Sequence, residues 1–224
     1  MTGSEADDAA KVARLTAIYD ILSNTYPTYE ESRDPWMTNG LSATPFRHLV
    51  SGCLSTMTVT SRVIRAAVPL YQRVTSFEEL LALDNDTLRD IIRPVAHYNR
   101  KTVNLKAMCS QIIDEHGGTI PRTREAVMEL KGVGRKVADL VMNHLNDQDS
   151  IAVDSHVLRV LRRLGMVGNV SPETAADAIK QLTPPGYRRH AHEWLIQLGM
   201  MVCHARKPDC GACVVRALCP TGNS

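Results

Sequence analysis

The feature that most constrains this chain is a helical spacing of apolar residues, which recurs while the alternation typical of strands is almost absent. Residues 10–24 repeat apolar positions at three- and four-residue steps. Thr44 and Ser171 each stand before a proline, the pattern that opens a helix with a capping hydroxyl. Residues 99–116 form a long predicted helix that ends at Gly117. The sequence therefore predicts an all-α fold with short connections.

Composition limits the class of protein further. With 224 residues, of which 44% are hydrophobic, the chain can build one large or two small cores. No stretch approaches the roughly 20 apolar residues of a membrane span, and the acidic first fifteen residues lack an apolar core, so we expect neither a membrane segment nor a secretory signal. Residues 1–40 carry a net charge of −4 and the remainder +6, which suits a polyanionic partner or an ordinary solvated surface.

Four of the six cysteines lie within 17 residues near the C-terminus, in the pattern Cys203-x6-Cys210-x2-Cys213-x5-Cys219. Clustered thiolates bind zinc or an iron–sulfur cluster. Zinc ribbons usually use two short Cys-x2–4-Cys pairs, whereas the pattern contains only one. The wide outer spacings favour a cuboidal iron–sulfur cluster, with zinc as the alternative. The nearby cations, solvated or facing a phosphate, are Arg206, Lys207 and Arg216.

A glycine-containing turn joins two predicted helices in the middle of the chain. The first covers residues 122–130, and the second restarts at Arg135. Glycines permit positive φ and close approach of a ligand, and N–H groups at a helix N-terminus attract a phosphate. The turn therefore indicates a DNA-backbone contact without sequence preference, although an ordinary αα-hairpin is the alternative. The candidate DNA-binding residues are Lys131, Gly132, Val133, Gly134 and Arg135.

Two residues after this turn are candidates for catalysis. Lys136 lies in the first turn of the second helix, where the helix dipole and Arg135 disfavour its ammonium form and favour a nucleophilic amine. The alternative is a solvated surface lysine. Asp154 follows an apolar run and occupies the N-cap position of the predicted helix 155–164. A capping role and a catalytic carboxylate are both compatible with this position.

The order of LKGVGRKVADLV, AVDSHVLRV and the four-cysteine pattern resembles the endonuclease III family of base-excision-repair DNA glycosylases, from about Thr44 to Cys219. The resemblance implies that Lys136 and Asp154 are catalytic and that a [4Fe–4S] cluster is bound by Cys203, Cys210, Cys213 and Cys219. It also implies two all-α lobes with a DNA cleft between them. A six-helix barrel with the helix-hairpin-helix would cover residues 36–148. The iron–sulfur domain would combine residues 1–35 with residues 149–224.

The chain departs from the family pattern at positions that read the lesion. Met57 stands where the family usually has a glutamine that fills the gap left by an extruded base. His97 replaces the usual wedging leucine and is followed by Tyr98, an alternative wedge. Lys131 adds a cation before the hairpin, and the loop 146–150 contains neither glycine nor proline. We therefore expect abasic sites, mismatched lesions or single-stranded DNA to be processed better than a well-paired oxidised pyrimidine.

The resemblance implies a bifunctional DNA glycosylase and AP lyase that removes oxidised pyrimidines and cuts 3′ to abasic sites by β-elimination. We expect a monomer that acts on damaged double-stranded DNA in the cytoplasm, at the nucleoid. The alternative is a non-catalytic or AP-lyase-only DNA-binding protein. The presence of both Lys136 and Asp154 favours the enzyme over a protein that only binds DNA. A ferredoxin-like electron carrier is disfavoured, because the cluster ligands occupy one short tail.

Overall fold

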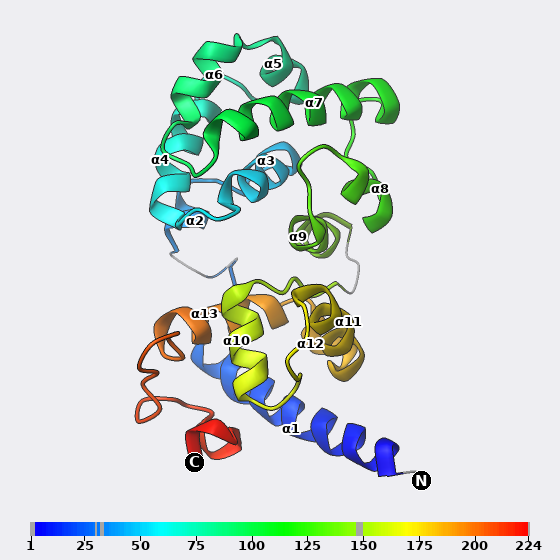
Figure 1. Cartoon of the computed structure of the whole chain (residues 1–224), viewed down its shortest axis with the longest axis vertical. Coiled ribbons are helices and arrows are strands. Elements are labelled where there is room, and N and C mark those ends of the chain that lie inside the picture. The colour runs from blue at the N-terminus through cyan, green and yellow to red at the C-terminus, as the bar shows by residue number, and fades with distance from the viewer. Residues whose placement is uncertain (1–2, 30, 32–33, 147–149, 224) are drawn as a thin grey trace. The chain divides into compact units, whose positions relative to one another are not determined.

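The computed structural model describes residues 3–29, 31, 34–146 and 150–223 of the chain. All regular elements among these residues are helices, and no strand occurs there, which confirms the predicted all-α fold. None of the described helices is long and apolar enough to cross a membrane. The chain divides into two compact units, each with its own core. Figure 1 shows the helices of both units, coloured by residue number.

The first unit, here called the hairpin unit, consists of residues 33–146. Its helices are α2 (Pro35–Thr38), α3 (Pro45–Ser55), α4 (Thr60–Tyr71), α5 (Phe77–Ala82), α6 (Asn85–Ile92), α7 (Tyr98–His116), α8 (Arg124–Glu129) and α9 (Arg135–Asn146). The core joins apolar residues of α3 to α9, and helix α7 contacts α3, α5 and α6. This long helix therefore connects the short helices around it.

The second unit, here called the cysteine unit, combines residues 1–32 with residues 147–224. Its elements are α1 (Gly3–Thr25), α10 (Ser155–Arg163), α11 (Pro172–Leu182), α12 (Pro185–Arg188), α13 (Ala191–Met201), η1 (Arg216–Leu218) and η2 (Thr221–Asn223). Helix α1 lies against α11 and α13, and α10 packs closely on α13. The fully buried ring of Tyr19 ends in a hydroxyl that pairs with Thr183 Oγ1 at 3.1 Å. The N-terminal helix is thus part of the C-terminal core.

Local capping chemistry determines where several helices begin and end. Thr44 Oγ1 accepts a hydrogen bond from Arg47 N at the start of α3, and Ser171 Oγ accepts one from Thr174 N at the start of α11. Helix α7 ends at Gly117, whose φ of 61° is the left-handed conformation of a C-terminal cap. The chain between Thr183 and Val202 is divided between α12 and α13, and His190 is the N-cap of α13.

Candidate functional site

The predicted glycine turn lies between α8 and α9 in the hairpin unit. Gly132 adopts a φ of 82°, and a Cβ added there would lie 2.8 Å from Asn104 Cβ. Both the left-handed backbone and this contact with α7 require glycine. Gln111, also on α7, accepts a hydrogen bond from Lys131 N at 2.7 Å. The buried Val133 side chain joins the core. Helix α7 therefore packs against the turn and stabilises it.

Gly134 differs from Gly132 in having no structural need for glycine within the unit. Its φ is not positive, and no atom lies within 4 Å of the position of an added Cβ. Its carbonyl accepts a hydrogen bond from Ala138 N at 3.0 Å and so begins α9. No described residue accepts a hydrogen bond from its N–H. The exposed backbone at Gly134 is therefore open to a ligand from outside the chain.

The two glycines provide a matched pair of substitutions. Gly132→Ala should lower the free energy of unfolding by about 2–4 kcal/mol, through positive φ and overlap with Asn104. Gly134→Val should change it by about 1 kcal/mol or less, yet weaken binding to every DNA duplex by roughly tenfold or more. Thermal unfolding and DNA titration at fixed salt measure both effects. A Gly134→Val protein with altered lesion preference and unchanged general affinity would contradict a backbone-contact role.

The cations of the turn have different surroundings. Lys131 is exposed, whereas Arg135 Nε donates to Asp139 Oδ2 at 2.8 Å. The carboxylate of Asp139 is only 1% exposed and also lies 3.5 Å from Arg124 Nη1 of α8. One buried carboxylate thus connects both helices of the hairpin. Arg135 stabilises the hairpin through this pair, a role that sequence reasoning missed.

Lys136 is the second residue of α9 and directly follows the open turn. Its side chain is partly exposed, whereas Val137 and Ala138 after it are buried in the core. Val137 packs against α3: its Cγ1 lies 3.1 Å from the position of a Cβ added at Gly52. The packing of its neighbours therefore orients the helix so that Lys136 faces away from the core.

Asp154 lies in the cysteine unit as the N-cap of α10. Its Oδ1 accepts hydrogen bonds from His156 N at 2.8 Å and Val157 N at 2.9 Å, so it caps the helix. The run 151–153 before it is buried, and Ala152 O accepts a hydrogen bond from His192 Nδ1 at 2.8 Å. The carboxylate is therefore held in one orientation. The preceding positions 147–149 of the expected Gly- and Pro-free loop lie outside the described residues.

Lys136 and Asp154 thus belong to different units. Each is placed by helix geometry within its own unit: Lys136 by the first turn of α9 and Asp154 by the cap of α10. Both positions are those that the motifs predicted locally.

The three candidate lesion-reading residues all lie in the hairpin unit. Met57, between α3 and α4, has a φ of 54° and is 81% exposed. His97 has a φ of 56° and is exposed as the N-cap of α7. Tyr98 follows it, and its half-buried ring packs against the core. Met57 and His97 are therefore presented to solvent on strained backbone, whereas Tyr98 is partly held by packing.

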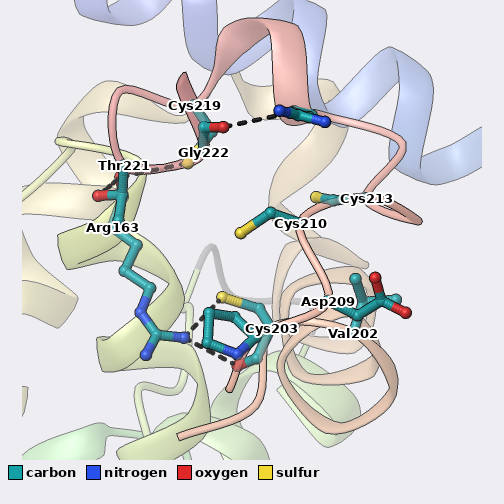
Figure 2. A pocket seen from close by; sticks show the side chains of 11 residues that line it. Arg163, Val202, Cys203, Asp209, Cys210, Cys213, Cys219, Thr221 and Gly222 are labelled. Carbon is teal, nitrogen blue, oxygen red and sulfur yellow. Dashed lines mark hydrogen bonds between the residues drawn. The ribbon is translucent and has the colours of Figure 1, made fainter. Parts of the chain in front are cut away.

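The four clustered cysteines line one open cavity in the cysteine unit (Figure 2). Among the described residues, no three His, Cys, Asp or Glu groups converge as ligands of a single ion. A tetrahedral zinc site would require such convergence, with zinc–sulfur distances near ~2.3 Å. A cube of iron and sulfide holds its ligands farther apart. The donor set and the cavity therefore fit an iron–sulfur cluster better than a zinc ion.

Two arginines of α10 contact Cys203 of this cavity, and sequence reasoning missed both. Arg163 Nη1 lies 3.3 Å from Cys203 Sγ and donates to His204 O at 2.7 Å. Arg159 Nε donates to Cys203 O at 2.9 Å. Their four-residue spacing, which places them on one face of the helix after Asp154, is the signal that would have found them. Of the cations named from sequence, Arg216 lines the cavity.

Comparison with known proteins agrees with this arrangement. The family model described as HhH-GPD superfamily base excision DNA repair protein matches residues 50–185, and that of the iron–sulfur binding domain of endonuclease III matches residues 203–219. Endonuclease III of Rickettsia felis is 32% identical over 210 residues, which are 94% of this chain and 95% of the relative. Endonuclease III of Escherichia coli K12 is 32% identical over 177 residues, or 79% and 84% of the two chains.

Solved structures show the same fold. A trapped endonuclease III–DNA covalent intermediate superposes with a TM-score of 0.85 at 26% identity, covering 95% of this chain and 97% of that chain. A thermostable thymine-DNA glycosylase reaches 0.78 at 21% identity, covering 98% of each chain, and shows the fold alone.

The helical hairpin and the matched residues define the class as HhH-GPD superfamily base excision DNA repair proteins. Within this class, the chain belongs to the endonuclease III family. It is accordingly a base excision repair DNA glycosylase and AP lyase. The resemblance read from the motifs and the expected iron–sulfur cofactor are confirmed.

Proposed function

We propose that Lys136 is the nucleophile and Asp154 the catalytic carboxylate of this enzyme, acting as a monomer on damaged double-stranded DNA in the nucleoid-containing cytoplasm. The observation that carries the proposal is the position of Lys136, partly exposed in the first turn of α9 and two residues after the open backbone at Gly134. A phosphate bound at that helix N-terminus would bring a deoxyribose next to the amine. The proposal includes the other candidate contacts of the turn, namely Lys131, Gly132, Val133 and Arg135.

The mechanism begins with extrusion of the damaged nucleotide from the duplex. The neutral amine of Lys136 attacks C1′, the bond from C1′ to the base breaks, and the base leaves with a proton. Asp154 stabilises the positive charge that develops on the sugar. The opened sugar then forms a Schiff base with Lys136. Loss of a proton from C2′ and departure of the 3′ phosphate complete the β-elimination, and hydrolysis frees the lysine.

The structure of Asp154 supports this role as well as a capping role. Two helix N–H groups donate to the same carboxylate oxygen, Oδ1, and so fix the orientation of the carboxylate. An ionised carboxylate that cannot rotate is suited to stabilising a cationic sugar without reorganisation. We further propose that both units act on the DNA, with Lys136 contributed by the hairpin unit and Asp154 by the cysteine unit.

We propose that Cys203, Cys210, Cys213 and Cys219 bind a [4Fe–4S] cluster. When bound, the cluster would cross-link the tail to α10 through the contacts of Arg163 and supply no group that base release or β-elimination requires. Arg163 would donate a hydrogen bond to the Cys203 thiolate, and Arg159 would hold the carbonyl of the same residue. The residues present therefore assign the cluster a structural role.

Protein purified without air should be yellow-brown and contain about four irons per chain. Metal analysis together with the visible spectrum measures this. Arg163→Met should accelerate iron loss in air, because it removes the hydrogen bond to Cys203 Sγ. The control is Arg206→Met, at an exposed position outside these contacts. A colourless protein with one zinc per chain would contradict the assignment.

One duplex assay tests the proposed function and its lesion preference. An oligonucleotide with a single abasic site should be cut on its 3′ side, and the same duplex with one oxidised pyrimidine should be cut more slowly. The thioether of Met57 offers at most a weak acceptor to the orphaned base, where a glutamine amide offers donors and an acceptor. Met57→Gln with His97→Leu should therefore raise the rate on the oxidised pyrimidine and leave the abasic site unchanged.

The outcomes of this assay separate the alternatives. Cleavage of the abasic site alone, with or without the substitutions, would identify an AP-lyase-only protein. Binding without any cleavage would identify a non-catalytic DNA-binding protein. Equal cleavage of both substrates by the wild type, with no gain from the two substitutions, would show that Met57 and His97 do not limit lesion recognition.

A further inference from the structure

Two of the three candidate lesion-reading residues share an unusual backbone conformation. Three non-glycine residues among those described have positive φ, and two of them are Met57 and His97 in the hairpin unit. Both side chains are exposed. A non-glycine residue remains in this region only when its surroundings determine it, because the conformation is strained. Contacts from elsewhere in the unit must therefore hold the two turns.

A buried lysine supplies those contacts. Lys101 lies on α7, one turn after His97, and is only 7% exposed. Its ammonium donates to Leu54 O at 2.7 Å and to Thr56 O at 2.8 Å. These carbonyls belong to the end of α3 and to the residue before Met57. The lysine thus fixes the segment that leads into the exposed methionine.

Thr58 connects the turn at Met57 to the turn at His97. Its Oγ1 lies 3.3 Å from Lys101 Nζ and accepts a hydrogen bond from Ala96 N at 3.1 Å. Ala96 directly precedes His97. The two positive-φ residues, 40 positions apart in the sequence, are therefore connected through one hydroxyl and one ammonium.

The environment of Lys101 is unusual for a buried cation. Its hydrogen-bond acceptors are two carbonyls and a hydroxyl, and no carboxylate among the described residues pairs with it. Buried charges are normally paired because desolvation is costly. The three acceptors in the turns around Met57 therefore stabilise the buried ammonium.

We propose that Lys101 is a positioning residue that holds Met57 and His97 together as one DNA-probing element. The inference rests on the proposed function, in which these two side chains enter the space left by an extruded nucleotide. Lys101 itself touches neither DNA nor the reacting sugar. It acts through the geometry of the two turns.

The charge state of Lys101 gives this role a pH dependence. Burial lowers the pKa of Lys101 to about 8, and the charged or titratable groups that act on it are the Cys53 thiol of α3 and Arg100 of α7. The ammonium has three N–H donors for its three acceptors, whereas the neutral amine has two. The element should therefore loosen as the pH rises above about 8, and a Lys101→Arg protein, which stays charged, should keep its affinity.

The same helix provides a matched control. Lys106, one turn and a half further along α7, is half-buried and donates to the carbonyls of Leu81 and Leu83. It secures the end of α5 and the connection to α6, which contain neither Met57 nor His97. Lys106→Met therefore removes the same kind of contact without touching the proposed element.

Binding to a duplex with a tetrahydrofuran abasic analogue tests the proposal, because the analogue has no aldehyde and Lys136 chemistry does not enter. Lys101→Met should weaken this binding by about tenfold, the equivalent of one charge-assisted hydrogen bond. Lys106→Met should change it by less than about twofold, and Lys101→Arg should restore most of the loss. With Met57→Ala and His97→Ala already present, Lys101→Met should add little further loss, because the residues act as one element.

A fluorescent purine opposite the analogue reports whether the space is filled. Its emission should rise with Lys101→Met and stay at the wild-type level with Lys106→Met. Thr58→Val removes the hydroxyl that connects the two turns, together with its bond to Thr56 O, and should reproduce the loss even if Lys101→Met does not fold. Equal effects of the Lys101 and Lys106 substitutions, or a full tenfold loss in the Met57/His97 double-alanine background, would overturn the proposal.

Borohydride trapping at a true abasic site separates this inference from the proposed function. Wild-type protein that forms no covalent adduct would contradict the function. Adduct formation by the wild type and by Lys101→Met at saturating protein, together with equal analogue binding by both, would contradict only the positioning role of Lys101.

Discussion

Lys136→Ala should abolish the covalent adduct that borohydride traps at an abasic site, and strand cleavage should fall by at least ~10³-fold. The substitution removes the only nitrogen that the proposed Schiff base uses. Binding to an uncleavable duplex should persist, because the open backbone at Gly134 and the exposed Lys131 remain. Gel separation of the adduct and single-turnover cleavage measure the two effects.

Lys131→Ala is the control for charge near the phosphate. It should weaken binding to all duplexes alike and reduce the salt dependence by about one ion, yet leave adduct formation intact at saturating protein. Adduct that remains undiminished in Lys136→Ala would place the nucleophile elsewhere in the chain.

Asp154→Asn should leave the stability nearly unchanged and slow base release by about 100-fold or more. Asparagine caps a helix as well as aspartate does, so the hydrogen bonds to His156 N and Val157 N can be kept. The negative charge is lost, and with it the stabilisation of the cationic sugar. Thermal unfolding and single-turnover release of an oxidised pyrimidine separate the two roles.

The chain contains its own reference for the capping contribution. Asp84 caps α6 with the same hydrogen-bond pattern, accepting hydrogen bonds from Asp86 N at 3.1 Å and Thr87 N at 2.9 Å. Asp84→Asn should therefore show the stability change of an Asp-to-Asn cap and no change in base release. If Asp154→Asn loses stability and keeps its activity per folded molecule, Asp154 is only a cap.

Signals carried by neighbouring residues made much of the fold predictable. The caps at Thr44 and Ser171 act within three residues, and the terminating Gly117 acts within one turn, so tertiary structure changes them little. The cysteine pattern is equally local, since its ligands lie within one tail. The hairpin and the position of Asp154 follow from the same kind of signal.

The contacts that position the candidate site were not predictable in this way. Lys101 donates a hydrogen bond to Leu54, 47 residues before it, and Arg163 contacts the sulfur of Cys203, 40 residues after it. Such pairs depend on how helices close around a core, and nothing in their own sequence neighbourhood indicates a partner. The positive φ of Met57 was likewise not predictable, because methionine has no preference for it and Lys101, which contacts the preceding residue, lies far away in the sequence.

The discontinuous cysteine unit has a consequence for synthesis on the ribosome. Leu15, Ile18 and Leu22 of α1 are fully buried against the half of the core that residues 151–198 contribute. Translation adds about 5–20 residues per second, so this apolar face emerges on the order of ten seconds before its partners. The hairpin unit, which is continuous in sequence, can fold during that interval. A ribosome that stalls once residue 146 has left the exit tunnel would therefore leave a folded hairpin unit attached to an uncovered α1, which is a ready substrate for chaperones and proteases.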